Sequence, residues 1–328
     1  MKKRIWSFFM VICLLVSVSL PVHAEEDEIQ TDVIALTDEN RYDPQYYQKP
    51  EVRYPLARTR AFTVTEDFEE YIVNALENFE EQIDIYAYKI PRGEAGPAFF
   101  QIVNRHPELF YVCNEIVCNS LNNISRTITV SYTGTPEEID VQKQAFEIAA
   151  DQAAGQVEQS MTDVEKALVV YEYLIQLCEY DKERFDNKTV PNISHSAYGA
   201  LVEKIAVCDG YGKAYKYIMK NKLGINCELV TSNTMNHAWN MIQIGGEWYH
   251  VDATWDDPVW DCIGRVRHAY FLLSDQAIAD AAHNHRGWVT DITADSTLYD
   301  DKYWSEIDSA ICYYQGNWYY SIYQDSKV

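Results

Sequence analysis

Basic residues are scarce in this sequence. It contains 27 Lys and Arg against 50 Asp and Glu, so its formal net charge is −23 at pH 7. A chain this acidic repels phosphate groups and anionic lipid surfaces, and we therefore expect neither nucleic acid nor a membrane surface among its partners. Solubility alone is a sufficient reason for most of the charge.

Two common metal-binding motifs are absent as well. The sequence has no Cys-x-x-Cys pair and no His-Glu-x-x-His motif, so a zinc site has little support, and we expect neither a metal nor a cofactor. In "AHNHRGW", His283 and His285 are interpreted as part of a surface loop. In "DATWDDP", Asp256 and Asp257 are expected to form a capped turn beside the proline rather than a calcium site.

Only one long apolar run occurs, over residues 5–20. It follows three basic residues at positions 2–4 and precedes a small residue, Ala24, which is the layout of a secretory signal peptide. The run is shorter than the ~20 residues of a spanning helix. We therefore predict that residues 1–24 are a cleaved signal peptide, and that the mature protein is secreted or held at the cell surface without a stable membrane span.

An odd number of cysteines is left after this cleavage. Of the eight in the sequence, Cys13 lies in the signal peptide, which leaves seven and therefore at least one unpaired thiol. Export permits disulfides. Cys113 and Cys118 suit either a bridged hairpin or two free thiols, and a disulfide partner for Cys208 stays open.

Four segments are expected after the signal peptide. Residues 25–60 are polar and contain proline, which is typical of a linker or a loosely docked arm. Residues 61–133 are predicted to form an N-terminal α+β region, and residues 134–290 the main domain. Residues 291–328 contain "AICYYQGNWYYSIY", which predicts two aromatic strands around a Gln-Gly-Asn turn.

The apolar periodicity favours an α+β fold, with helices first and strands later. Helices are predicted from Thr65 to about Tyr88, over 95–104, from 136 to about 159, from 163 onward, and over 208–222. Strands are predicted over 109–118, 124–132, 226–232, 237–244 and 247–255.

Cys208 stands where one of these helices begins, in "AVCDGYGKAYKYIMKNKLG". The positive end of the helix dipole and the unpaired N–H groups of the first turn favour the thiolate, which is the reactive form of cysteine. This position alone is weak support for a nucleophile, because a structural cysteine at a helix start is the commoner case.

Two predicted strands downstream add a histidine and an aspartate. "HAWNMIQI" and "EWYHVDATW" flank Gly245–Gly246, a two-residue hairpin signal. Centring the turn there pairs Trp239 with Asp252. His237 then lies on the same face as Asp252, in the diagonal relation that spans ~7–8 Å.

A thiol, an imidazole and a carboxylate can act as nucleophile, base and orienting group. Cys208, His237 and Asp252 fit these roles. The same pairing places His250 on this face as well, opposite Met241, and the pattern does not choose between the two histidines.

These motifs resemble those of the transglutaminase-like superfamily, in particular its exported bacterial members. "VCDGYGKAYKYIMKNKLGINC" and "NHAWNMIQIGGEWYHVDATWDDP" carry the resemblance, which covers roughly residues 163–275. It implies that Cys208 is the nucleophile, His237 the base and Asp252 the third member, with His250 structural. It also implies a papain-related α+β core in which the helix bearing the nucleophile packs on an antiparallel sheet.

Two weaker resemblances concern other segments. "HSAYGALVEKIAVC" is similar to the family's approach to the cysteine, which implies Tyr198 as a candidate to stabilise the oxyanion; a tyrosine that packs a turn is the alternative. The aromatic C-terminal stretch faintly resembles cell-wall-binding repeats, whereas a single copy is more simply an edge hairpin.

The resemblance implies an acyltransferase that works on protein or peptide amides, some of them associated with the cell wall. A thioester on Cys208 would be resolved by an amine, giving crosslinking, or by water, giving peptidase or amidase activity. The alternative is a binding module that keeps the fold without catalysis. An intact set of Cys208, His237 and Asp252 counts against that alternative.

Overall fold

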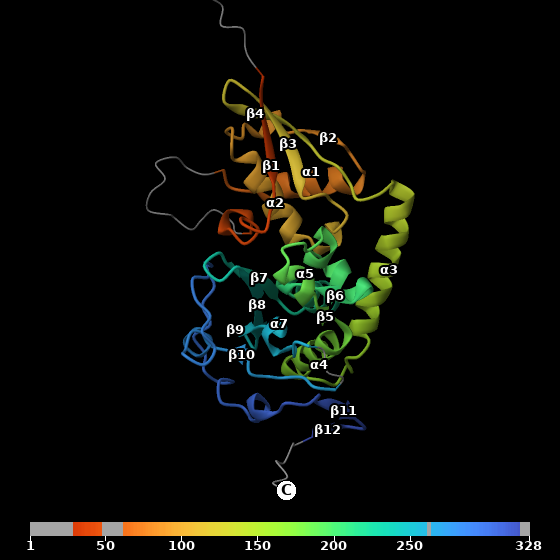
Figure 1. The fold of residues 1–328 in the computed structure, drawn as a ribbon, viewed down its shortest axis with the longest axis vertical. Coiled ribbons are helices and arrows are strands. Elements are labelled where there is room, and N and C mark those ends of the chain that lie inside the picture. The colour runs from red at the N-terminus through yellow and green to blue at the C-terminus, as the bar shows by residue number, and fades with distance from the viewer. Residues whose placement is uncertain (1–28, 48–61, 261–263, 322–328) are drawn as a thin grey trace, which may run out of the picture.

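The computed structural model of the protein describes residues 29–47, 62–260 and 264–321. The predicted signal peptide, residues 1–24, lies outside the described residues, and so does Cys262. Within the described part of the chain, no helix combines the length and the apolar character needed to cross a bilayer. Helices and mainly antiparallel sheets make up the molecule (Figure 1), so the predicted α+β class is confirmed.

The N-terminal part of the chain forms a four-stranded antiparallel sheet in the order β1-β3-β4-β2. Its strands are β1 (Gln30–Ala35), β2 (Gln82–Asp84), β3 (Glu115–Leu121) and β4 (Ile124–Thr129). Its helices are α1 (Glu66–Glu77) and α2 (Ala95–Arg105). One hydrophobic cluster joins the buried faces of both helices to the sheet.

The prediction of a linker or loosely docked arm over 25–60 is wrong for the part that the structure describes. Strand β1 pairs with β3 along its whole length and forms one edge of the sheet. Beyond β1, Tyr42 and Tyr46 are buried. The side chain of Asn104 in α2 donates a hydrogen bond to the carbonyl oxygen of Tyr46, at 3.0 Å, and ties this segment to the helix.

The helix predicted from Thr65 to about Tyr88 ends earlier, at Glu77. Phe79 adopts a left-handed backbone conformation with φ of 56°, which a helix does not continue through. Ile83 then lies in β2, where pairing with β4 replaces helical hydrogen bonds. Ile83 fitted the apolar spacing of the predicted helix because its side chain is buried in the same core as the apolar face of α1.

Two helices lead to the main domain, and both begin with a capping box. The boxes are formed by Thr135 with Glu138 and by Thr162 with Glu165. The helices are α3 (Pro136–Ala154) and α4 (Asp163–Leu177). Helix α3 runs along one side of the molecule, from the N-terminal sheet to the region of α4 (Figure 1), and ends before the predicted Gln159.

A second four-stranded antiparallel sheet forms the centre of the main domain, in the order β10-β9-β8-β7. Its strands are β7 (Cys227–Ser232), β8 (His237–Ile244), β9 (Glu247–Val251) and β10 (Phe271–Leu273). Helix α6 (Cys208–Lys216) is buried over its whole length, packs on β7 and β8, and continues as a π-helical segment over Tyr217–Lys222. The predicted helix over 208–222 is confirmed in this form.

The hairpin register predicted from Gly245–Gly246 is confirmed. Both glycines have positive φ, 63° and 93°, as a tight turn between twisted strands requires. Ile244 pairs with Glu247, and Met241 pairs with His250. The period of two along each strand then fixes which side chains share a face.

The C-terminal hairpin also forms as predicted, from β11 (Cys312–Tyr314) and β12 (Asn317–Tyr319). The indole N–H of Trp318 donates a hydrogen bond to Glu165 in α4, at 3.2 Å. Upstream of the hairpin, Trp304 packs edge-on against Phe271 of β10. The predicted segment boundaries at 133/134 and 290/291 stay predictions. Trp304 and Ile311, which follow the second boundary, belong to the same hydrophobic core as the main domain.

The remaining elements are short. The short helices are α5 (Lys182–Asp186), α7 (Ala253–Asp256) and α8 (Asp275–Ile278). The 3-10 and π segments are Pro44–Tyr46, Tyr86–Tyr88, Pro107–Leu109, Asn192–His195, Gly199–Glu203 and Tyr303–Glu306. Strands β5 (Glu179–Tyr180) and β6 (Ile205–Ala206) pair in parallel just before α6.

Candidate active site

Cys208 is the first residue of α6, and two glycines allow the helix to sit as close to its neighbours as it does. A Cβ atom on Gly210 would lie 2.6 Å from the carbonyl oxygen of Ser194, which is backbone and cannot easily move. A Cβ atom on Gly212 would lie 2.3 Å from Leu229 in β7. The motif Cys-Asp-Gly-Tyr-Gly therefore brings the thiol and the helix N-terminus tightly against the loop before α6 and against the sheet.

His237 and Asp252 meet where the predicted hairpin register places them. His237 begins β8, and Asp252 follows the last residue of β9. Nε2 of His237 lies 2.6 Å from Oδ2 of Asp252. The other carboxylate oxygen, Oδ1, accepts hydrogen bonds from the backbone N–H groups of Thr254 and Trp255, at 3.0 and 3.2 Å. Asp252 is thus also the N-cap of α7, and its carboxylate is fixed from both sides.

His237 connects this carboxylate to the thiol. Its ring is hydrogen-bonded to Cys208 as well as to Asp252, and since Nε2 faces the carboxylate, Nδ1 is left for the sulfur. Burial favours the neutral ring, but the charge of Asp252 and the interaction with Cys208 outweigh it and raise the pKa of His237 to about 10. The ring therefore carries a proton at neutral pH.

Asp252 is held in its charged form. Burial acts to raise its pKa, yet the charge of His237 and the hydrogen bonds from His237 and His285 hold the pKa well below its usual value. The site consequently contains a carboxylate, a protonated imidazole and a thiol in series. This is the arrangement in which an imidazolium favours a thiolate.

Tyr42 covers the thiol. The Sγ atom of Cys208 donates a hydrogen bond to the hydroxyl of Tyr42 at 3.1 Å, and that hydroxyl donates to Oδ1 of Asp209 at 3.2 Å. Asp209 is held in turn by Nδ1 of His195, at 2.8 Å, and by Lys213. Cys208 and Tyr42 are each only 2% exposed. Burial and the nearby Asp209 carboxylate raise the pKa of Tyr42 well above its ordinary value, so its phenol stays neutral.

The structure places Tyr198 away from this contact. Its ring stacks on Phe110, with centroids 4.6 Å apart, as part of the main hydrophobic cluster. The hydroxyl that reaches the thiol is that of Tyr42, which packs with Cys208 and Ala238. The stacking of Tyr198 on Phe110 fits the alternative of a packing tyrosine, and the oxyanion role of Tyr198 stays a prediction.

His250, the rival histidine, belongs to a different group of side chains. Its Nδ1 accepts a hydrogen bond from the indole N–H of Trp239 at 2.9 Å, and its Nε2 donates to Asp275 at 2.7 Å. Burial is the main cause that lowers its pKa. A neutral ring with both nitrogens engaged has a structural role, and the structure brings His237 rather than His250 to Cys208.

His285 corrects a second prediction. The stretch with His283 and His285 was expected to be a surface loop, but the His285 ring is fully buried. Its Nε2 lies 2.9 Å from Oδ2 of Asp252, the same oxygen that His237 contacts. No sequence spacing pointed to this contact, since the loop returns to the sheet only through the tertiary fold.

His237, Asp252 and His285 are close enough to hold a metal ion, since one potential ligand atom from each lies within 4.8 Å of the others. The two imidazole nitrogens already approach one oxygen of Asp252 at hydrogen-bonding distances of 2.6 and 2.9 Å. A hydrogen in each short contact accounts for the geometry. We therefore interpret the three side chains as a hydrogen-bonded group.

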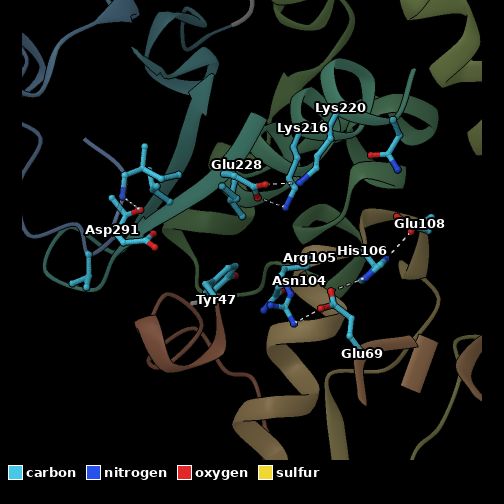
Figure 2. A pocket seen from close by; sticks show the side chains of 16 residues that line it. Tyr47, Glu69, Asn104, Arg105, His106, Glu108, Lys216, Lys220, Glu228 and Asp291 are labelled. Atoms are coloured by element: carbon cyan, nitrogen blue, oxygen red, sulfur yellow. Dashed lines mark hydrogen bonds and ion pairs between the residues drawn. The ribbon is translucent and has the colours of Figure 1, made fainter. Parts of the chain in front are cut away.

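A separate pocket of about 440 Å³ lies between α2, α6 and β7 (Figure 2). Its walls are charged, but the charges are paired: Lys216 with Glu228 at 2.9 Å, and Arg105 with Glu69 at 3.0 Å. Cys208, His237 and Asp252 are not among the residues that line it. These three candidate catalytic residues meet around the start of α6, outside this pocket.

The geometry defines a protein with a papain-like set of cysteine, histidine and aspartate. Residues 150–253 match the family model described as the transglutaminase-like superfamily, and this span contains Cys208, His237 and Asp252. The resemblance to this family that the motifs predicted is thus confirmed over this part of the chain.

A solved structure described as the crystal structure of a TGase is also similar. It shares 12% identity, with a TM-score of 0.30, over 67% of this chain and 58% of the other. This chain thus spans less than two thirds of that protein's length. A search of curated proteins gives no match.

Proposed function

We propose that the protein is a cysteine enzyme that transfers acyl groups from the amides of proteins or peptides. The observation that carries the proposal is the hydrogen-bonded series of Cys208, His237 and Asp252 at the N-terminus of α6. Membership of a superfamily of papain-like cysteine enzymes supports it. The particular reaction rests on the chemistry of these three side chains.

The first half of the reaction forms a thioester. The thiolate of Cys208 attacks the carbonyl carbon of the substrate amide, and the electron pair of the carbonyl passes to its oxygen. The dipole and the unpaired N–H groups of the first turn of α6 favour this oxyanion. As the C–N bond breaks, His237 donates its proton to the leaving amine, and the acyl group stays on the sulfur.

The second half releases the acyl group to another nucleophile. The neutral ring of His237 accepts a proton from an attacking amine or water molecule, and the sulfur leaves as a thiolate. An amine gives a new amide, which crosslinks two chains when both partners are proteins. Water gives a carboxylic acid, which is peptidase or amidase activity. The first half of the mechanism is common to both.

A binding module without catalysis is the second candidate. The observation that favours it is the burial of Cys208 under Tyr42, because a substrate cannot reach a thiol that is 2% exposed without moving the tyrosine. The raised pKa of His237 and the fixed carboxylate of Asp252 favour the enzyme, since a module that only binds has no use for either.

We further propose that the protein works outside the cytoplasmic membrane, on substrates of the cell surface or wall. The predicted signal peptide supports the location. The exposed face of the C-terminal hairpin supports an aromatic contact with a wall polymer, since Tyr314 and Tyr319 are 63% and 54% exposed there. N-terminal sequencing of exported material should give a first residue near Glu25, and a first residue before Ala24 would contradict this.

Intact-protein mass spectrometry tests the proposed chemistry. The purified protein is incubated with a p-nitrophenyl ester, which acylates reactive thiols, and is then treated with a small primary amine or with buffer alone. We expect a single acyl adduct on Cys208, which decays faster with the amine if transfer is favoured over hydrolysis. Cys208→Ala should give no adduct, whereas Cys312→Ala, which removes an exposed thiol, should behave as wild type. An adduct distributed over several cysteines, or none, would support the binding module.

A further inference from the structure

His285 is held in place by the backbone of the loop that follows α8. Its backbone N–H donates a hydrogen bond to the carbonyl oxygen of Ile278 at 3.0 Å. The backbone N–H of the preceding residue, Asn284, donates to the carbonyl oxygen of Asp280 at 2.7 Å. The Asp280 carboxylate accepts from the backbone N–H of His283 at 2.9 Å. These bonds turn the loop so that the His285 ring points inward to the sheet.

Both nitrogens of the His285 ring face oxygen acceptors. Nε2 lies 2.9 Å from Oδ2 of Asp252, and Nδ1 lies 3.0 Å from the carbonyl oxygen of His283. A neutral imidazole has only one N–H, so it can donate only one of these bonds. The doubly protonated ring donates both. His250 provides the contrast, because its Nδ1 faces the N–H of Trp239 and therefore stays unprotonated.

The surroundings of the ring suit a buried cation. Besides Asp252, it is enclosed by aromatic rings whose centroids lie 4.4 Å (Trp255), 4.8 Å (Trp239) and 5.3 Å (Tyr270) away. Aromatic side chains stabilise a cation held near them, and a carboxylate at hydrogen-bonding distance supplies the counter-charge. The ring has both.

We propose that His285 is a positioning residue for the proposed reaction, a charged imidazolium that shares the Asp252 carboxylate with His237. This inference rests on the proposed function. With His285 on Oδ2 and backbone N–H groups on Oδ1, the carboxylate cannot turn away from His237. The charge of His285 also offsets that of Asp252, which lets His237 release its proton to the leaving amine more readily.

The groups that face His285 limit what else could set its charge. They are Asp252, the His237 ring at 5.5 Å between centroids, the Tyr270 phenol, and His250, which is neutral. Asp252 is the only carboxylate among them. The two histidines therefore share one counter-ion. When His285 is removed, the full negative charge of Asp252 acts on His237.

Nitrogen-15 NMR of the histidine rings tests the protonation state on the intact wild-type protein. The signals of His285 are assigned by their loss in His285→Gln. We expect both ring nitrogens to have the shifts of protonated imidazolium at pH 7. A ring with one protonated nitrogen at this pH would overturn the proposal. This measurement needs no substrate, so its outcome is independent of whether the protein is an enzyme.

The pH profile of Cys208 alkylation by iodoacetamide tests the positioning role. In His285→Gln, the amide can still donate to Asp252 but carries no charge. On the basic limb of the profile, where His237 loses its proton and the alkylation rate changes, we expect the midpoint to shift to higher pH by on the order of one unit. His250→Gln is the matched control, because it removes a buried histidine of β9 that contacts Trp239 and Asp275 rather than Asp252, and its profile should not shift. An unmoved limb in His285→Gln, with the same loss of thermal stability as the control, would overturn the role. A wild-type Cys208 without any pH-dependent reactivity would instead contradict the proposed function.

Discussion

The hydroxyl of Tyr42 lies 3.1 Å from the sulfur of Cys208, although 166 residues separate them in the chain. The hydroxyl donates onward to Asp209, so it accepts a hydrogen bond from the thiol and favours the protonated sulfur. Tyr42 belongs to the segment that continues from β1 and is anchored on α2. In this arrangement the N-terminal segment covers the residue on which the proposed chemistry depends.

Tyr42→Ala should therefore expose and activate the thiol. We expect alkylation of Cys208 by iodoacetamide at about pH 7 to become at least tenfold faster, because both the cover and the competing hydrogen bond are lost. The second-order rate is measured by mass spectrometry of the adduct.

Tyr46→Ala provides the control for that change. Tyr46 is a buried tyrosine of the same segment whose ring packs against Phe100, with centroids 5.9 Å apart, rather than against Cys208. Equal acceleration in both variants would mean that loosening of the segment, and not the Tyr42 hydroxyl, controls access. No acceleration in Tyr42→Ala would mean that the tyrosine does not limit the thiol.

Replacement of Asp252 separates its two roles. In Asp252→Asn, the amide can still accept from the backbone N–H groups of α7, but the negative charge beside His237 is lost. We expect acylation of Cys208 to slow by a factor of about 10²–10⁴, a range guided by loss of the corresponding aspartate in serine proteases. Thermal stability at neutral pH should also fall, because His237 loses the counter-charge that raises its pKa. A variant that acylates at the wild-type rate would show that Asp252 serves only as the helix cap.

His250→Ala should act on stability. The substitution leaves the indole N–H of Trp239 without its acceptor in the core, and a buried unpaired group of this kind costs about 1–3 kcal/mol. Urea unfolding followed by tryptophan fluorescence measures the change. A free energy of unfolding equal to that of wild type would contradict the structural role of His250.

The stability of the fold should depend on pH through His237. Its pKa in the folded protein is raised from 6.5 to about 10, so the folded state holds the proton more tightly than the unfolded state. The resulting stabilisation is complete below about pH 6.5 and is lost as the pH rises through about 10. We expect the urea midpoint to fall between pH 7 and pH 10, and to fall less in His237→Gln. His283→Gln, at a partly exposed histidine paired with Asp280, should keep the wild-type dependence.

The sequence predicted the parts of the site that local rules determine. Gly245–Gly246 fixed the hairpin register, and the period of two along β8 and β9 then brought His237 to Asp252. The helix predicted from Cys208 also begins at that residue. Turn chemistry and periodicity act over a few residues, so these predictions needed no knowledge of the tertiary fold.

Contacts between distant segments could not be predicted in this way. Tyr42 reaches the site because β1 joins the edge of the N-terminal sheet, and His285 because the loop after α8 folds back on β8 and β9. Neither position has a periodic signal of its own. Tyr198 was proposed for the oxyanion only from the resemblance of the segment before Cys208 to the family, and its ring stacks on Phe110 in the core.

The most direct test of the account is the pH dependence of Cys208 alkylation in the Tyr42→Ala background, with His237→Ala and His250→Ala added in turn. We expect rapid alkylation near pH 6 in the background protein and in the His250 variant, because His237 favours the thiolate in both. In the His237 variant, Cys208 should react only as the pH approaches the ~8.5 at which a free cysteine titrates. If low-pH reactivity survives without His237, the helix N-terminus alone activates the thiol and the proposed series of Cys208, His237 and Asp252 is wrong.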